Sequence, residues 1–252
     1  MATAVLSPMA IPGLHTPPSR KDLEKAALAY NLLPDDKDQP EISPVHLEEI
    51  KKIIVSHDVQ EKFGIHVVHG HLLVDQGKVM HGTAMTRLRG CWTRPTDISG
   101  LDVGNIHGHI FALSPNGQFQ AYEYRQEGPP PMSPNDNAFV AALKAYLQNH
   151  GLGSLIGLQV LNEDKDKQLQ EFVLGDNNGA VMLDAEDTRI TESCRVTGYV
   201  VIKTEESGVT ELKGNETHTP TIRQTHQVFT DGKPLPDEKS LMDALRADGV
   251  ID

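Results

Sequence analysis

The chain has 252 residues, a net charge of −12 at pH 7, 38% hydrophobic residues and only 5% aromatic residues. A chain of this length can bury a sizeable core without disulfide bonds, and the low aromatic content predicts a mainly aliphatic core. The negative charge argues against nucleic acid or an anionic membrane as a partner, because both require a basic protein surface.

The cysteines and the N-terminus predict a cytoplasmic protein. Cys91 and Cys194 lie far apart and form neither a disulfide framework nor a zinc-binding CxxC pair, so free thiols in a reducing compartment are expected. The first residues lack the basic region of a signal peptide, and no apolar run reaches the ~18 residues that a membrane span needs. The expected partner is a small-molecule substrate, and the oligomeric state is left open.

Three kinds of segment are expected before the β-rich region. Residues 1–19, rich in Ala, Pro and Ser, are predicted to form a disordered tail. Residues 20–62 are predicted to be a helical segment, with one helix over 20–33 and a second that begins at Pro44. The polar stretch 34–40 between these helices is expected to be a solvated linker.

Residues 63–252 are predicted to form a β-rich core domain that contains one central helix. Strands over 65–74 and 79–88 are expected to form a first hairpin. A second hairpin is expected over 106–125, because an Asn-Gly pair at its centre supplies the positive φ angles that tight turns require.

The central helix is expected to begin near Asn135 and Asp136 and to end at Gly151, a residue that suits the left-handed conformation after a helix. Short β segments follow, with a turn at Asp176–Gly179 and a last helix near 239–246. Because strands outnumber helices and the helices flank them, the sequence favours an α+β fold. Its antiparallel β-rich core would be a sheet, a sandwich or a barrel.

Five of the twelve histidines lie in two short windows, and each window contains a His-Gly-His tripeptide. The first window holds His66, His69 and His71, and the second holds His107 and His109. Residues two apart on a strand point to the same face, so each tripeptide could present two imidazoles to one ion. We therefore predict His69, His71, His107 and His109 as ligands of a divalent transition metal, with zinc as the first choice.

Other side chains in the β-rich region have weaker signals. Tyr122 and Tyr124 are candidate catalytic residues. If the loop of the second hairpin has two or four residues, the numbers of facing residues sum to an odd value, and both tyrosines then lie on the same face as His107 and His109. There they could donate hydrogen bonds, shuttle protons or only pack across the strands. A three-residue loop would instead bring Glu123 to that face. His218 and His226 lie in a polar segment and are expected to be exposed.

The first window also carries a resemblance. Gly64, His69, His71 and Asp75 resemble the first cupin motif, in which a glycine, an HxH pair and an acidic residue occur in this order. The glycine spacing is one residue short, aspartate stands where the motif has glutamate, and no second cupin motif follows. Residues 63–71 are also similar to the FG-x-x-LLH-x-H segment of small fungal proteins of unknown function. A fungal enzyme of secondary metabolism, such as a cyclopenase-type lyase, would be in keeping with this resemblance.

Two hypotheses for the function follow from the histidines. The first is a small metal-dependent enzyme in which the ion acts as a Lewis acid or activates a water molecule, giving lyase, isomerase or hydrolase chemistry on a small molecule. The second is a non-catalytic small-molecule-binding or scaffold protein, whose core histidines are satisfied by hydrogen bonds. The metal content of the purified protein distinguishes them.

Overall fold

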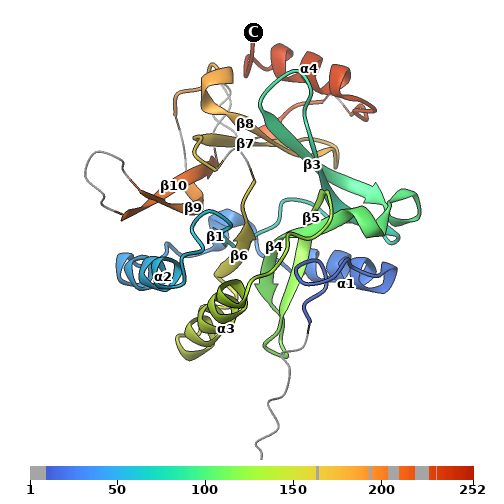
Figure 1. The fold of residues 1–252 in the computed structure, drawn as a ribbon. Helices are drawn as coiled ribbons and strands as arrows, with labels where there is room; N and C mark the ends of the chain where they lie inside the picture. Colours follow the sequence, from blue (N-terminus) through green and yellow to red (C-terminus); the bar gives the residue numbers. More distant parts are fainter. Residues whose placement is uncertain (1–9, 163–164, 193–194, 204–209, 219–226, 231) are drawn as a thin grey trace, which may run out of the picture.

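The protein is an α+β fold built around a closed, mixed β-barrel, as seen in the computed structural model (Figure 1). Ten strands close the barrel, because β10 at one end of the strand order also pairs with β7 near the other end. This confirms the predicted fold class with a β-rich core and flanking helices. The structure describes residues 10–162, 165–192, 195–203, 210–218, 227–230 and 232–252.

The strands run through most of the described chain. They are β1 (Phe63–Val67), β2 (Lys78–Ala84), β3 (Gly90–Asp97), β4 (Ile106–Leu113), β5 (Phe119–Gln126), β6 (Ile156–Val160), β7 (Leu169–Leu174), β8 (Gly179–Asp184), β9 (Arg195–Lys203), β10 (Thr210–His218) and β11 (Gln227–Val228). Short 3₁₀ helices are η1 (Asp36–Asp38), η2 (Ile98–Gly100), η3 (Val103–Asn105) and η4 (Ala185–Asp187). The barrel order is β10-β9-β1-β6-β4-β5-β2-β3-β8-β7, and β11 extends the edge of β7.

The helices lie against the outside of the barrel (Figure 1). They are α1 (Arg20–Tyr30), α2 (Pro44–Ser56), α3 (Pro134–Asn149) and α4 (Glu238–Ala247). The predicted start at Pro44 is confirmed, and Gly151 has the expected positive φ of 66° just after α3. The first helix ends at Tyr30, three residues earlier than its predicted end at residue 33. None of the described helices has both the length and the apolar character required to cross a membrane.

The predicted first hairpin is wrong. β1 ends at Val67 and pairs with β6 and β9, whereas β2 pairs with β3 and, in parallel, with β5. Val68 N–H still donates to Leu155 in the β1–β6 register, but Gly70 N–H donates to Pro34, so the chain has left the sheet at the first tripeptide. The first His-Gly-His tripeptide therefore lies in a connection, not on a strand.

The second hairpin, β4–β5, is confirmed, but its register differs from the expected one. Ser114 N–H donates to the Gln118 carbonyl at 2.9 Å, which leaves a three-residue loop. The paired residues therefore sum to an even number, as in His107 opposite Arg125, except at a β-bulge where Ile110 lies opposite Glu123. Glu123 and Arg125 share the histidine face of the hairpin, and the prediction that both tyrosines lie on that face is wrong.

The barrel is apolar outside and polar inside. On β1, Phe63, Ile65 and Val67 belong to the main apolar cluster under the helices, and Phe63 stacks on Phe139 of α3 with ring centroids 5.3 Å apart. The alternate residue His66 points the other way. Alternating strand residues face opposite sides of a sheet, so the burial of both faces explains why β1 and β6 have no exposed positions.

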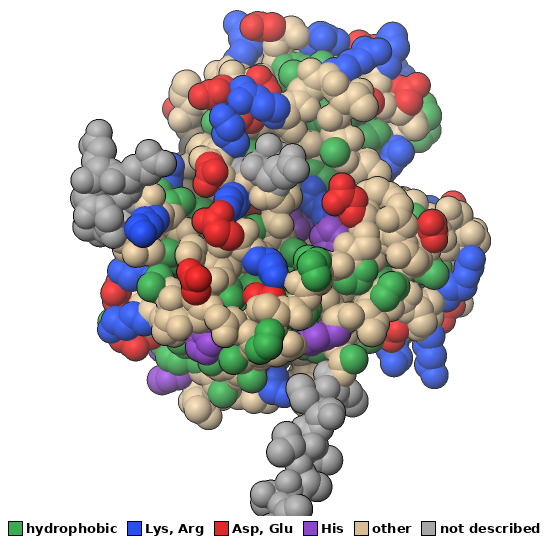
Figure 2. All heavy atoms as spheres, viewed as in Figure 1, with side chains coloured by type: hydrophobic (Ala, Val, Ile, Leu, Met, Phe, Trp, Pro, Cys, Tyr) green, Lys and Arg blue, Asp and Glu red, His purple; other side chains and the backbone are tan. Residues whose placement is uncertain are grey.

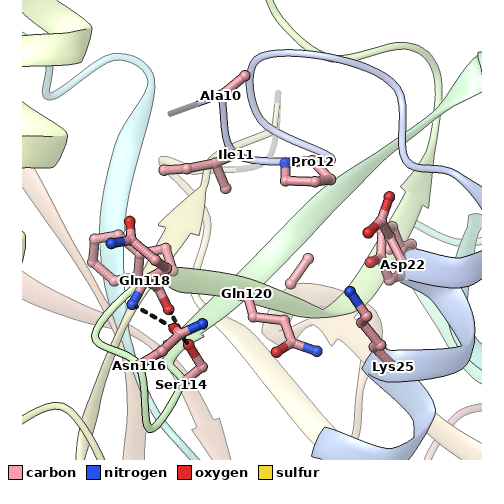
Figure 3. A pocket seen from close by; sticks show the side chains of 12 residues that line it. Ala10, Ile11, Pro12, Asp22, Lys25, Ser114, Asn116, Gln118 and Gln120 are labelled. Atoms are coloured by element: carbon pink, nitrogen blue, oxygen red, sulfur yellow. Dashed lines mark hydrogen bonds between the residues drawn. The ribbon is translucent and has the colours of Figure 1, made fainter. Parts of the chain in front are cut away.

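Residues 10–19 differ from the disordered tail that their composition predicted. Leu14 is fully buried in the main apolar cluster, and the Gly13 carbonyl accepts a hydrogen bond from Gly108 N–H at 2.9 Å. Together with α1 and the β4–β5 turn, this segment borders a shallow pocket that has Asp22 and Lys25 on one side (Figure 3). Residues 1–9 lie outside the described part of the chain.

Candidate metal centre

Three histidines and one glutamate converge at one point inside the fold. His69, His71, Glu171 and His218 each offer one ligand atom, and these atoms all lie within 4.8 Å of one another. The Glu171 carboxylate is 2.7 Å from Nε2 of His218, 3.6 Å from Nε2 of His71 and 3.8 Å from Nε2 of His69. Donors of a tetrahedral zinc site lie about 3.3–3.6 Å apart, so this His/Glu cluster is close to the spacing that a metal ion requires.

Strand pairing brings two members of the cluster together. β7 and β10 run parallel, and His218 lies directly opposite Glu171 across this pair. His69 and His71 come from the connection that follows β1. Tyr30 fixes the backbone of this connection, because the Tyr30 hydroxyl accepts a hydrogen bond from His71 N–H at 3.2 Å. The cluster thus joins three segments that are more than 40 residues apart in sequence.

The hydrogen bonds of the imidazoles suit metal binding through Nε2. Nδ1 of His69 lies 2.8 Å from the carbonyl oxygen of Val67, which can only accept, so Nδ1 carries the proton and Nε2 is left with a lone pair. Nδ1 of His218 lies 2.9 Å from a carboxylate oxygen of Asp36. A carboxylate behind a ligating histidine is the arrangement that commonly orients such ligands in metal sites.

Asp36 belongs to the stretch 34–40, which is not the solvated linker that its composition suggested. Arg195 donates hydrogen bonds to the carbonyl oxygens of Asp36, Gln39 and Pro40. The Gln39 amide donates to the carbonyl of Val68 at 2.5 Å, next to the first tripeptide. This stretch therefore packs beside the His/Glu cluster, and the side chain of Asp36 is buried.

The charges in the cluster are strongly coupled. Burial lowers the pKa of His69 to about 3, and the neighbouring histidines add to this effect, so the imidazole is neutral at pH 7. Burial acts in the same direction on His218, but Glu171 and Asp36 outweigh it and raise its pKa to about 10. Burial opposes ionisation of Glu171, yet His218 and the other cluster histidines hold its pKa well below the usual range. Metal binding would thus release the proton of His218.

A small interior space, here called the inner cavity, adjoins the cluster. Its volume is about 20 Å³, which is room for about one water molecule. His69 and Glu171 line it on one side, and Glu123 and Arg125 of β5 line it on another. Burial, with a further contribution from Glu171, raises the pKa of Glu123 to about 7. A carboxyl group with this pKa can both accept and donate a proton near neutral pH.

The second histidine pair lies outside the His/Glu cluster. Nδ1 of His109 is 2.9 Å from the carbonyl of Val160, and its Nε2 is 3.2 Å from a guanidinium nitrogen of Arg125, so both ring nitrogens are occupied. Nδ1 of His107 is 3.1 Å from the carbonyl of Glu127. His109 lines the inner cavity without offering it a ligand atom, whereas His107 faces a larger opening of the barrel.

The two candidate tyrosines lie on the opposite face of β5 from Glu123. Tyr122 packs against Tyr30, with ring centroids 6.2 Å apart, in a small apolar cluster behind the first tripeptide. Burial raises its pKa well above the usual value, so it stays protonated. Tyr124 lies in the main apolar cluster close to Gly13. Neither tyrosine belongs to the four residues that converge on a metal position.

Sequence reasoning missed Glu171, His218 and Asp36. His218, expected to be exposed, is 1% exposed, and the strand that carries it, β10, was not expected. A weak signal was available at Glu171, because this charge interrupts the apolar run of β7 and faces away from the buried Phe172. His226 and Cys194 lie outside the described residues, and Cys91 is a buried free thiol.

Comparisons of the chain with protein-family models, with curated proteins and with solved structures found no match. The chemistry of the cluster and its surroundings is therefore the basis for assigning a function. Three neutral or deprotonable imidazoles and one carboxylate are a donor set that suits zinc and also iron, nickel or copper. The buried His/Glu cluster could hold a metal ion.

Proposed function

We propose that this protein is a small metal-dependent enzyme that binds one divalent transition-metal ion, with zinc as the first candidate, through the His/Glu cluster. The observation that carries the proposal is the convergence of three imidazoles and the Glu171 carboxylate, with the Asp36 carboxylate 2.9 Å behind His218. Burial without a ligand would be costly for so many polar groups, and an ion would satisfy them together.

The surroundings of the cluster support catalysis over a purely structural role. Closed structural zinc sites have no room for a further ligand, whereas catalytic sites keep a position open to water or substrate. The inner cavity beside His69 and Glu171 offers that room, and Glu123 borders it as the proton-transferring group. The ion would supply Lewis-acid activation of water or of a substrate oxygen, giving hydrolase, lyase or isomerase chemistry.

The substrate is a small molecule on this proposal. A second space, here called the outer cavity, opens at one end of the barrel and has a volume of about 580 Å³. Ligand sites for small molecules typically measure about 300–1,000 Å³. His109 and Arg125 line both cavities, so a molecule in the outer cavity would lie next to the inner one. A lyase would be in keeping with the resemblance of residues 63–71 to small fungal proteins of unknown function.

One observation favours a second candidate, a non-catalytic binding protein. His218 lies 2.7 Å from Glu171 and 2.9 Å from Asp36, so a protonated imidazole between two carboxylates would satisfy these groups without an ion. Such a protein would use the outer cavity only for binding. The two candidates differ in whether the protein holds a metal ion that has a coordination position open to water or substrate.

Titration of metal-free protein with cobalt(II) separates these candidates. We expect saturable visible absorption bands of a low-coordinate Co(II) site and a change in these bands when azide is added, because azide would take the open position. Absence of cobalt binding would overturn the metal proposal. Cobalt bands that azide leaves unchanged would show a closed site and would overturn the catalytic role. His107→Ala is the matched control, since it removes a histidine of the second tripeptide and should leave the bands as they are.

A further inference from the structure

We infer that the outer cavity is an anion site, in which Arg125 binds a carboxylate or phosphate group of the substrate. The link to catalysis rests on the proposed function, but the anion site itself does not require the metal. The outer cavity opens at a hollow near β4 and β5 that contains histidine and basic side chains (Figure 2).

Arg125 carries a positive charge, and no acidic group in the described part of the chain forms an ion pair with it. Arg125 lies on strand β5 of the barrel. In the described residues, no carboxylate oxygen lies within 4.0 Å of the guanidinium nitrogens of Arg125. Its Nε is fully buried and has no hydrogen-bond partner. Arg125 as a whole is half-buried and lines the outer cavity, so an anion bound there would give its charge a partner.

His109 holds the guanidinium in place without cancelling its charge. The proton of His109 is on Nδ1, which donates to the carbonyl of Val160 at 2.9 Å, so Nε2 can only accept from Arg125 at 3.2 Å. Burial and the nearby Arg125 charge keep the pKa of His109 well below its usual value. A neutral acceptor therefore orients Arg125 and leaves its full positive charge for a ligand.

The other charged groups around the outer cavity do not compete for this role. Lys165 forms an ion pair with Glu61, and Glu127 is exposed at the rim. Glu123 faces the inner cavity, and its carboxylate oxygens lie more than 4.0 Å from the guanidinium nitrogens of Arg125. The whole chain carries a net charge of −12, so Arg125 is not part of a general basic surface that would attract anions without a specific site.

The position of Arg125 between the two cavities defines the substrate class. A planar guanidinium binds carboxylate and phosphate through paired hydrogen bonds. A small molecule held in this way would lie in the outer cavity, with Glu171 and His69 beyond the inner cavity that adjoins it. The geometry thus points to a small carboxylic acid or phosphate ester.

The test measures the binding of benzoate, phenyl phosphate and neutral benzamide to metal-free full-length protein by calorimetry. We expect benzoate or phenyl phosphate to bind and benzamide not to bind, and the stronger anion identifies the group. Arg125→Gln should weaken anion binding about tenfold or more, because charge-assisted hydrogen bonds are lost. Arg87→Gln, which changes an exposed arginine, should bind like the wild type.

Three results would overturn the inference: no binding of either anion, equal binding of benzamide, or wild-type affinity in Arg125→Gln. If Arg125→Gln does not fold, Arg125→Lys takes its place. Arg125→Lys protein with wild-type anion affinity and an unchanged preference between the two anions would count against paired binding by the guanidinium. Elemental analysis of the same preparations before metal removal tests the proposed function separately. Anion binding by a protein that takes up no metal would leave the anion site in place and refute only the metalloenzyme.

Discussion

At the scale of single residues, the two His-Gly-His tripeptides have different surroundings and should respond differently to substitution. His71→Ala removes a nitrogen 3.6 Å from Glu171 and should weaken zinc binding by about 100-fold or more, beyond the loss typical of an outer-shell change. His107→Ala is the matched control, because it changes a half-buried histidine outside the His/Glu cluster. Competition titration against a coloured chelator measures both affinities. Equal zinc affinities in the two variants would show that the cluster is not the metal site.

Asp36 should contribute to metal affinity without touching the ion. Its carboxylate lies 2.9 Å from Nδ1 of His218 and would orient the ring and increase the basicity of Nε2. Asp36→Asn keeps the shape but removes the charge, so zinc affinity should fall about 10–100-fold while the stoichiometry stays the same. The same competition titration measures this effect. Unchanged affinity would mean that Asp36 only packs against the cluster.

At the scale of elements, the start of α3 provides a pH-dependent prediction. Asp136 accepts hydrogen bonds from Ser133 N–H at 2.7 Å and from Lys62 at 2.5 Å. Burial opposes its ionisation, but Lys62 and Ser133 outweigh this and lower its pKa. The pKa of Asp136 is lower in the folded state than its unfolded value of about 3.9. The charged carboxylate therefore stabilises the fold fully above pH 3.9, and this stabilisation is lost as the pH falls through the folded-state pKa.

Asp136→Asn should therefore destabilise the protein at pH 7 by about 1 kcal/mol, the usual size of a capping interaction. The difference from the wild type should shrink as the pH falls below 4. Urea unfolding at pH 7 and at acid pH measures both quantities. Asp22→Asn is a useful comparison, because Asp22 forms the same capping box in α1 but is only half-buried and has no ion pair with lysine in the described chain. A difference for Asp136→Asn that is the same at every pH would contradict this account.

The elements that the sequence predicted well are those whose signals are local. Pro44 after a serine, Gly151 after an apolar helix, and the Asn-Gly turn of β4–β5 each act within a few residues, and the structure has all three. The β4–β5 register was missed by one residue because the turn leaves a three-residue loop. That difference decides which residues face the barrel interior, since a shift of one residue exchanges the two faces of a strand.

The candidate site could be predicted only in part, because its partners meet through long-range pairing. The first tripeptide was visible as a motif, and His69 and His71 do lie in the His/Glu cluster. Glu171 and His218 become neighbours only when β7 and β10 close the barrel. The interior face of β10 carries Glu216 and His218 in place of apolar residues, so the usual alternation does not mark it as buried.

At the scale of the whole molecule, a metal ion bound inside the barrel should stabilise the fold, because its ligands come together only in the native state. A ligand that binds only the native state at 100 times its dissociation constant adds about 2.7 kcal/mol of stability, or about 5–10 °C in melting temperature for a chain of this size. Thermal melting of metal-free protein with and without zinc measures the shift. His71→Ala should show little zinc-dependent change. The same rise in both proteins would indicate binding elsewhere.

The most direct test of the metal centre is elemental analysis of full-length protein purified without a histidine tag from zinc- and iron-supplemented medium. We expect about one transition-metal ion per chain in the wild type and in His107→Ala, and far less than one in His71→Ala, since metal affinity depends on the complete donor set. A wild-type protein that carries no metal, and takes up none from added zinc, would contradict the central claim.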